Sequence, residues 1–257
     1  MDSAPSCAPR YIWDGLYQSW DEACRVAVEQ SRVHSGRGWL QRIMQQILEY
    51  RKEYQQYGTA MPPRPSNLPL VCSLVSPKSI VDLGGSSGWC RDYLENSTRD
   101  LRVSSYTVIE LPAVVEFMKQ SRVHRSAVDY KSQGDELQQC DLLYANSVLQ
   151  YFESNVPLLD LIELCRPRHV LLDDLVAKDD EDFFTIQAHR DAAMPYRFIG
   201  LSKLLDELAH KGYRCLISQP YPSPVFGVIA PLEMSNFPKD KQLRYSLTIL
   251  FEKTSNR

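Results

Sequence analysis

The stretch "SIVDLGGSSGWCRDYL", residues 79–94, joins a short apolar run to a glycine-rich turn and then to a helical pattern. Its branched apolar residues predict a strand ending at Leu83, and the glycines that follow predict a turn before a helix. In an open α/β sheet, ligands bind beyond the carboxyl ends of the strands, usually at the turn after the first strand. The stretch therefore predicts both the first strand of such a sheet and the place of its ligand site.

The rest of the chain alternates strand patterns with helical ones. Strand patterns recur at "SYTVIE", "SAVDY", "CDLLYAN", "HVLLDDL", "YRCLISQ" and "YSLTILFE", and helical spacing appears in "NVPLLDLIELCRP" and "LSKLLDELAHKG". This alternation predicts a Rossmann-like, doubly wound α/β fold, with a mostly parallel sheet of about seven strands and helices on both faces. We expect the last strand to run antiparallel.

Two helix patterns precede the sheet. In "YQSWDEACRVAVEQ", Ser19 and Glu22 form the reciprocal capping arrangement that begins a helix, and "WLQRIMQQILEYRKEYQQYG" has helical apolar spacing before Gly58. The four prolines of "TAMPPRPSNLP" predict a linker, or a strap laid over the next domain. We therefore expect a helical N-terminal cap or lid with its linker over residues 1–68, followed by a Rossmann-like domain over residues 69–257.

Amino-acid composition indicates which classes of ligand the protein is expected to bind. Lys and Arg total 29 against 32 Asp and Glu, so the net charge of -3 predicts neither a nucleic-acid surface nor a membrane surface. The N-terminus lacks a signal pattern and no window approaches the roughly 18 apolar residues that span a bilayer, which predicts a cytoplasmic protein. Seven cysteines without a CxxC pair predict reduced thiols, and five histidines without metal-ligand spacing predict no metal site. A small molecule is the expected ligand.

The glycine turn departs from the dinucleotide-binding fingerprint. Its pattern is Asp82-x-Gly84-Gly85-x-x-Gly88 rather than Gly-x-Gly-x-x-Gly, and it places a carboxylate inside the turn. A carboxylate is unfavourable beside a pyrophosphate and suits a ligand with an amino group or a positive charge. Gly84 and Gly85 would let the backbone approach that ligand, and Gly88 would let the next helix pack closely. This pattern disfavours a nicotinamide-dependent oxidoreductase, the main alternative enzyme.

Acidic residues are also expected at the ends of the next two strands. Glu110 ends "SYTVIE", where its carboxylate could accept both vicinal hydroxyls of a ribose. Asp129 is expected to end the third strand, near an adenine. With Asp82, these acids describe a pocket for S-adenosylmethionine, and backbone carbonyls near Asn146 could take its amino group. The expected cofactor residues are Asp82, Gly84, Gly85, Gly88, Glu110, Leu111, Asp129, Asn146 and Ser147.

These motifs resemble those of a known family. "VDLGGSSGW" followed by "VIELPAVVE" resembles the first two motifs of class I methyltransferases, especially small-molecule O-methyltransferases. "WDGLYQSWDEA", "NSVLQYF", "LLDDL" and "FFTIQ" further resemble a family of bacterial methyltransferases associated with polysaccharide gene clusters. The resemblance covers most of the chain. It implies an S-adenosylmethionine-dependent methyltransferase. We expect it to methylate oxygen or nitrogen of a small polar molecule, with a sugar or sugar nucleotide as one option. The sequence leaves the oligomeric state open, with a homodimer as one option. A non-catalytic methyltransferase-like binding module is a further alternative, which the near-complete cofactor set disfavours.

Candidates for acceptor chemistry follow the fourth and fifth strands. His189 lies on the loop expected after the fifth strand, and an unperturbed histidine pKa of about 6.5 suits a general base, although loop histidines are often ordinary surface residues. The aromatic segment "YIWDGLYQSW" either docks the cap on the core or forms a lid over the cofactor. The catalytic candidates are His189, Asp173, Asp174 and Tyr151, and the substrate or lid candidates are Trp13, Tyr17, Gln150 and Gln187.

Overall fold

The computed structural model describes most of the chain from residue 12 to residue 254. The described residues are 12–30, 44–46, 48–49, 52–53, 56, 66–97, 102–121, 127–179, 181–189, 192–221, 224–225, 228–229 and 232–254. Much of the second predicted helix and most of the proline-rich segment lie outside them. The few described residues of that second pattern are helical.

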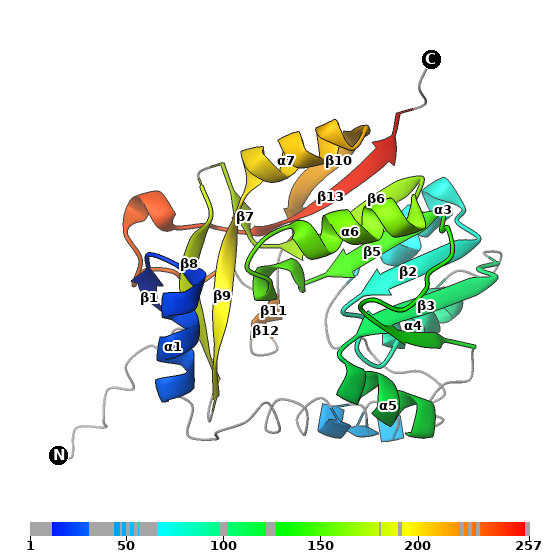
Figure 1. Ribbon diagram of the computed structural model, residues 1–257, viewed down its shortest axis with the longest axis horizontal. Coiled ribbons are helices and arrows are strands. Elements are labelled where there is room, and N and C mark those ends of the chain that lie inside the picture. Colours follow the sequence, from blue (N-terminus) through cyan, green and yellow to red (C-terminus); the bar gives the residue numbers. More distant parts are fainter. Residues whose placement is uncertain are drawn as a thin grey trace.

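A seven-stranded sheet forms the centre of the structure (Figure 1). Its order is β10-β13-β6-β5-β2-β3-β4; the strands from β2 to β6 pair in parallel, and β13 pairs antiparallel with both β10 and β6. The prediction of a mostly parallel sheet with an antiparallel last strand is therefore confirmed. The strands are β2 (Ser79–Leu83), β3 (Ser105–Glu110), β4 (Asp129–Ser132), β5 (Leu142–Asn146), β6 (His169–Leu175), β10 (Tyr213–Tyr221) and β13 (Ser246–Lys253).

Helices cover both faces of this sheet, because apolar side chains alternate between the faces along each buried strand. In β5, Leu142 and Tyr144 pack with α3, α4 and α5, whereas Leu143 and Ala145 pack with α6 and α7. None of the helices in the described parts of the chain is both long and apolar enough to cross a bilayer. The helices are α3 (Leu68–Val75), α4 (Trp89–Ser97), α5 (Pro112–Ser121), α6 (Val156–Cys165) and α7 (Leu201–His210).

A second, four-stranded sheet lies beside the carboxyl edge of the first, in the order β1-β8-β9-β7 (Figure 1). Here the expectation of an active-site loop around His189 was wrong, because His189 ends a strand, residues 183–189, that pairs antiparallel with a second strand, residues 192–200. The strand pattern is hard to read since Thr185 and Gln187, both polar, occupy buried positions on one face of β8. The strands are β1 (Trp13–Tyr17), β7 (Ala177–Lys178), β8 (Phe183–His189) and β9 (Ala192–Gly200).

The N-terminal helix begins where the capping pattern predicts. Helix α1 (Trp20–Gln30) packs on β8 and β9, and Ser19 Oγ accepts a hydrogen bond from the Glu22 N–H at 3.2 Å. The Glu22 carboxylate in turn accepts from the Gln18 N–H at 2.8 Å. The described N-terminal region is thus a strand and a helix that join the β8–β9 hairpin. Short elements complete the fold: η1 (Leu149–Tyr151), β11 (Pro224–Val225), β12 (Val228–Ile229) and η2 (Lys239–Lys241).

Candidate functional site

The glycine turn after β2 is packed so closely that side chains would not fit. Gly84 has a φ of 70°, and a Cβ added there would overlap the side chain of Val148, in the loop after β5. A Cβ on Gly85 would overlap the Asp82 carboxylate, and one on Gly88, with a φ of 73°, would lie 2.9 Å from the Tyr130 hydroxyl. The turn therefore needs glycine for both its conformation and its packing.

Asp82 supports this turn from inside. Its side chain is 1% exposed and accepts a hydrogen bond from the Tyr106 hydroxyl at 2.6 Å. Burial raises the pKa of Asp82 to about 7, against the opposing effect of the Tyr106 bond, and the charge of Glu110 raises it further. The carboxyl group of Asp82 contacts Gly85 and Tyr106. Asp82 therefore supports the conformation of the turn and is not a carboxylate exposed to a ligand.

Glu110 joins the end of β3 to the glycine turn. Its Oε1 accepts from the Ser86 N–H at 3.0 Å and its Oε2 from the Leu111 N–H at 2.9 Å. Burial raises the pKa of Glu110, while these two bonds favour the ionised form. A carboxylate offers about four acceptor positions, so Glu110 retains capacity for a ligand. Beside it, Leu111 is 55% exposed and offers apolar surface.

Asp129 is not where the sequence predicts it. It begins β4 opposite Thr107, and Ser132 is the residue that lies opposite Glu110 at the carboxyl edge. The apolar residues before Asp129 favoured a strand that ends at Asp129. Instead the strand begins there, because Tyr130 is buried and its hydroxyl donates a hydrogen bond to the Ser87 carbonyl at 2.6 Å. The exposed Asp129 carboxylate lies 3.7 Å from the Lys131 ammonium.

The loop after β5 forms the next wall of the site. Asn146 ends β5 and donates to the Tyr144 hydroxyl at 2.9 Å, and Ser147 has a left-handed φ of 54° with its N–H bonded to the Asp173 carbonyl at 3.0 Å. Gln150 is 1% exposed and donates through Nε2 to Ser147 Oγ at 2.9 Å. Its Oε1 meets no hydrogen-bond partner among the described residues.

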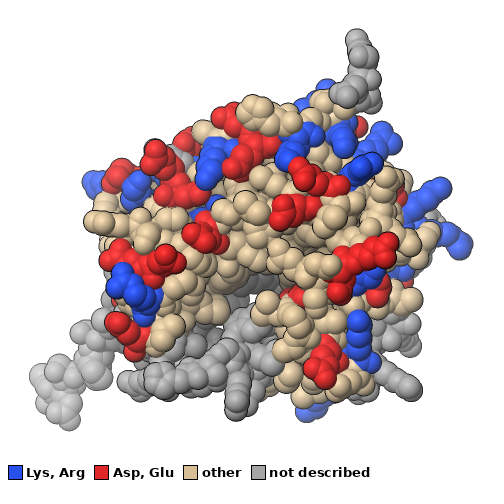
Figure 2. Space-filling view, in the orientation of Figure 1, with Lys and Arg blue, Asp and Glu red and all other residues tan. Residues whose placement is uncertain are grey.

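Two predicted acceptor residues meet across the two sheets. The Tyr151 hydroxyl donates to Gln187 Oε1 at 2.7 Å, although the residues lie 36 positions apart. The Tyr151 ring also packs edge-on against Tyr196 of β9, with ring centroids 5.5 Å apart. Tyr151 and Gln187 thus connect the loop after β5 to the second sheet. On the face shown in Figure 2, the surface is hollowed between the two sheets.

The N-terminal aromatics dock on the second sheet. Trp13 is buried and packs on Tyr196 and Phe198, with ring centroids 5.6 and 5.3 Å apart. Tyr17 packs more loosely, against the cluster around Ala23. The structure therefore agrees with the docking interpretation of this segment, and Trp13 is held in a core rather than displayed on a lid.

The two carboxylates at the end of β6 have structural partners. Asp173 is buried and accepts from the Asn67 N–H, the Asn67 side chain and Thr248 Oγ1, at 2.7, 2.9 and 2.7 Å. It thereby anchors the chain that enters α3. Asp174 is also buried and accepts from Ser246 Oγ at 2.6 Å. His189 pairs through its backbone with Ala192, and its side chain lies outside the described residues.

A buried arginine was missed by sequence reasoning. Arg197 of β9 is 0% exposed and donates to Asp182 at 3.2 Å and to Asn155 at 2.8 Å; its longer bond to the Leu149 carbonyl is 3.4 Å. It therefore holds the second sheet against η1 and the start of α6. The acidic run before β8 looks like solvated surface, and nothing local in the sequence indicates that Asp182 pairs with Arg197.

No family model and no curated protein matches the sequence. Solved structures do match the fold. Human N-acetylserotonin methyltransferase, in complex with S-adenosylmethionine, is 16% identical with a TM-score of 0.52, over 92% of this chain and 63% of that one. A protein from Listeria monocytogenes assigned as an S-adenosylmethionine-dependent methyltransferase is 11% identical with a TM-score of 0.50, over 79% and 98%. The fold is that of class I methyltransferases.

LepI, in complex with S-adenosylmethionine, is also similar, at 12% identity and a TM-score of 0.44 over 68% of this chain. The chain spans 42% of LepI and 63% of the human enzyme, less than two thirds of either. In this methyltransferase fold, the glycine turn, Glu110 and the loop after β5 lie at the carboxyl ends of β2, β3 and β5. This is the edge at which an open α/β sheet binds its ligand.

Proposed function

We propose that the protein is an S-adenosylmethionine-dependent methyltransferase acting on a small polar molecule. The observation that carries the proposal is Glu110, which links the ends of β2 and β3 at the carboxyl edge and keeps acceptor positions for a ligand. The structure of the human enzyme in complex with S-adenosylmethionine supports this cofactor.

The residues present fit an adenosyl amino acid. Glu110 would hold the ribose hydroxyls, Leu111 would pack on the adenine, and the backbone of Gly84, Gly85 and Gly88 would approach the ligand. Asn146 and Ser147 would take the amino acid end, and Asp82 would keep the turn in shape. When bound, S-adenosylmethionine supplies a methyl group that a sulfonium activates for in-line displacement. The chain's own task is then to orient the acceptor and exclude water.

We assign the acceptor side to Tyr151, Gln187 and Gln150. The Gln187 amide and the Tyr151 phenol, hydrogen-bonded at 2.7 Å, can both donate hydrogen bonds to a polar substrate and accept them from it. Gln150 adds a buried amide oxygen that accepts no hydrogen bond from any described residue. Because Asp173 and Asp174 are engaged by Asn67, Thr248 and Ser246, we give them no proton-transfer role. His189 stays a prediction as the general base for a hydroxyl acceptor.

The acceptor we propose is a sugar or sugar nucleotide, methylated at oxygen or nitrogen. The resemblance to methyltransferases associated with polysaccharide gene clusters supports it, as do the hydrogen-bonding groups on the acceptor side. A cytoplasmic location, a homodimer and the division into a cap over residues 1–68 and a sheet domain over 69–257 remain predictions of the sequence.

Calorimetry with two ligands tests the proposed cofactor. S-adenosylhomocysteine should bind the protein and NADH should not. Binding of NADH alone would replace the proposal with an oxidoreductase, and binding of neither ligand would favour a non-catalytic module.

A further inference from the structure

Two cysteines meet at the edge of the large sheet opposite the glycine turn. Cys140 precedes β5, Cys165 ends α6, and both are free and buried, at 7% and 0% exposure. The Cys140 N–H donates to the Cys165 carbonyl at 2.9 Å. This backbone bond holds the main chains of the two cysteines next to each other, which a disulfide between them requires.

The two thiols also contact each other. The contact with the Cys140 thiol lowers the pKa of Cys165, against the effect of burial, and the positive charge of Lys131 lowers it further. The same contact, together with burial, raises the pKa of Cys140. Of the two sulfurs, Cys165 is therefore the one that loses its proton more readily, and the thiolate is the form of cysteine that reacts with oxidants.

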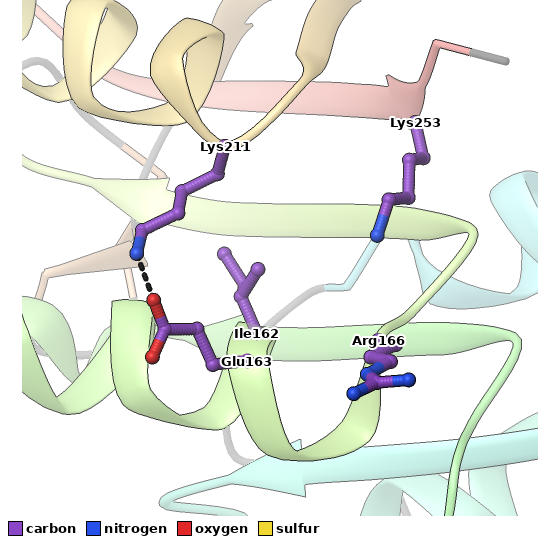
Figure 3. Close-up of a pocket in the computed structure, with 5 residues that line it drawn as sticks. All are labelled: Ile162, Glu163, Arg166, Lys211 and Lys253. Atoms are coloured by element: carbon purple, nitrogen blue, oxygen red, sulfur yellow. Dashed lines mark hydrogen bonds and ion pairs between the residues drawn. The ribbon is translucent and has the colours of Figure 1, made fainter. Parts of the chain in front are cut away.

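The pair is reached from a surface pocket. Cys140 lines a pocket of about 1060 Å³ whose rim is rich in cations. Next to it, Arg166 follows Cys165 at the end of α6, Lys253 lies on β13, and Lys211 forms an ion pair with Glu163 (Figure 3). Small oxidants therefore have a route to the pair from the side of Cys140.

We propose that Cys140 and Cys165 form a redox-active pair that closes into a disulfide when the protein meets a peroxide. The thiolate of the pair attacks one peroxide oxygen, giving a sulfenic acid and, after proton transfer, water. The second sulfur then displaces the hydroxyl group, the S–S bond forms, and a second water leaves. Two thiols and one hydrogen peroxide thus give one disulfide and two waters; the sulfurs are oxidised and the peroxide is reduced.

The disulfide would tie β5 to the end of α6 and close the segment that contains the whole loop after β5. This inference does not depend on the proposed function, since it concerns the opposite edge of the sheet. Closing a loop of this length should raise the melting temperature by roughly 5–10 °C, because it restricts the unfolded chain.

Hydrogen peroxide treatment of the full chain tests the pair. Expected results are the loss of two titratable thiols, a Cys140–Cys165 linked peptide in mass spectrometry, the higher melting temperature, and reversal of all three by dithiothreitol. Cys215→Ala, which removes an exposed and separate thiol, should respond like the wild type, and Cys165→Ala should not form the disulfide. If Cys165→Ala does not fold, peptide mapping of the peroxide-treated wild type still shows whether the Cys140–Cys165 disulfide forms. Absence of the linked peptide from peroxide-treated wild type would overturn the proposal.

Discussion

The hydroxyl of Tyr151 donates a hydrogen bond to Oε1 of Gln187 at 2.7 Å, joining the loop after β5 to the second sheet. This hydrogen bond therefore links η1, which follows β5, to strand β8. It lies beside the carboxyl edge of the large sheet, where we propose that the cofactor binds. If this bond orients the acceptor, its loss should affect transfer of the methyl group without affecting the cofactor.

Tyr151→Phe removes the hydroxyl and keeps the ring that packs on Tyr196. With an acceptor found in a panel of sugars and sugar nucleotides, methyl transfer should fall about tenfold, the equivalent of one net hydrogen bond. Affinity for S-adenosylhomocysteine should stay unchanged. Tyr93→Phe on α4 is the matched control. Equal rates in wild type and Tyr151→Phe would remove Tyr151 from the acceptor side.

Asp82→Asn should change how stability depends on pH. The Asp82 carboxyl has a pKa of about 7 in the folded chain, against 3.8 as its ordinary value, so between these values the folded state holds a proton that the unfolded state has lost. The free energy of unfolding should therefore fall as pH rises from about 4 to 7, and Asp82→Asn should abolish that part of the fall. At pH 8 the variant should be the more stable protein, by at most a few kcal/mol.

Urea unfolding at pH 5 and pH 8 measures both effects, with Asp129→Asn as an exposed control. Parallel pH profiles for wild type and Asp82→Asn would refute the shifted pKa.

Gly84→Ala and Gly134→Ala separate backbone strain from packing. Both glycines have positive φ, 70° and 97°, but a Cβ on Gly84 would overlap Val148 whereas one on Gly134 would meet nothing within 4 Å. We expect Gly134→Ala to cost about 1 kcal/mol and Gly84→Ala about 1–3 kcal/mol more. Denaturant unfolding gives both values, and Val148→Ala should restore part of the loss in Gly84→Ala. Equal losses at the two glycines would show that the turn is not packed against the loop after β5.

Arg197→Ala should destabilise the fold strongly. Its removal leaves Asp182 and Asn155 without their buried partner, and such losses cost about 3–5 kcal/mol. Arg214→Ala, which breaks an exposed ion pair with Glu252, should have a much smaller effect. Thermal unfolding compares them. A melting temperature for Arg197→Ala equal to that of Arg214→Ala would contradict the role of Arg197 as the link between the sheets.

Local patterns were enough to predict the large sheet. The strand Ser105–Glu110 is marked by β-branched and aromatic residues, and the start of α1 is marked by Ser19 and Glu22, whose capping bonds are local. These signals act over a few residues, so one sequence suffices to read them.

Contacts between distant residues were not predictable in this way. Asp173 has the same local pattern whether it faces a ligand or anchors the chain, and the partner that decides is Asn67, 106 positions away. The pairing of β8 with β9 was missed because Thr185 and Arg197 are buried against partners in β1 and just before α6, which no strand pattern reveals. Tyr151 and Gln187 could be proposed separately, but their contact required the fold.

Titration of S-adenosylhomocysteine into wild type and Glu110→Gln tests the central claim most directly. Glu110→Gln keeps the shape of the side chain and removes the charge that accepts the ligand's hydroxyls, so affinity should fall about tenfold to a hundredfold. Glu116→Gln, on the exposed face of α5, should bind like the wild type. Unchanged affinity in a folded Glu110→Gln protein would contradict the placement of the cofactor at the carboxyl edge of β3.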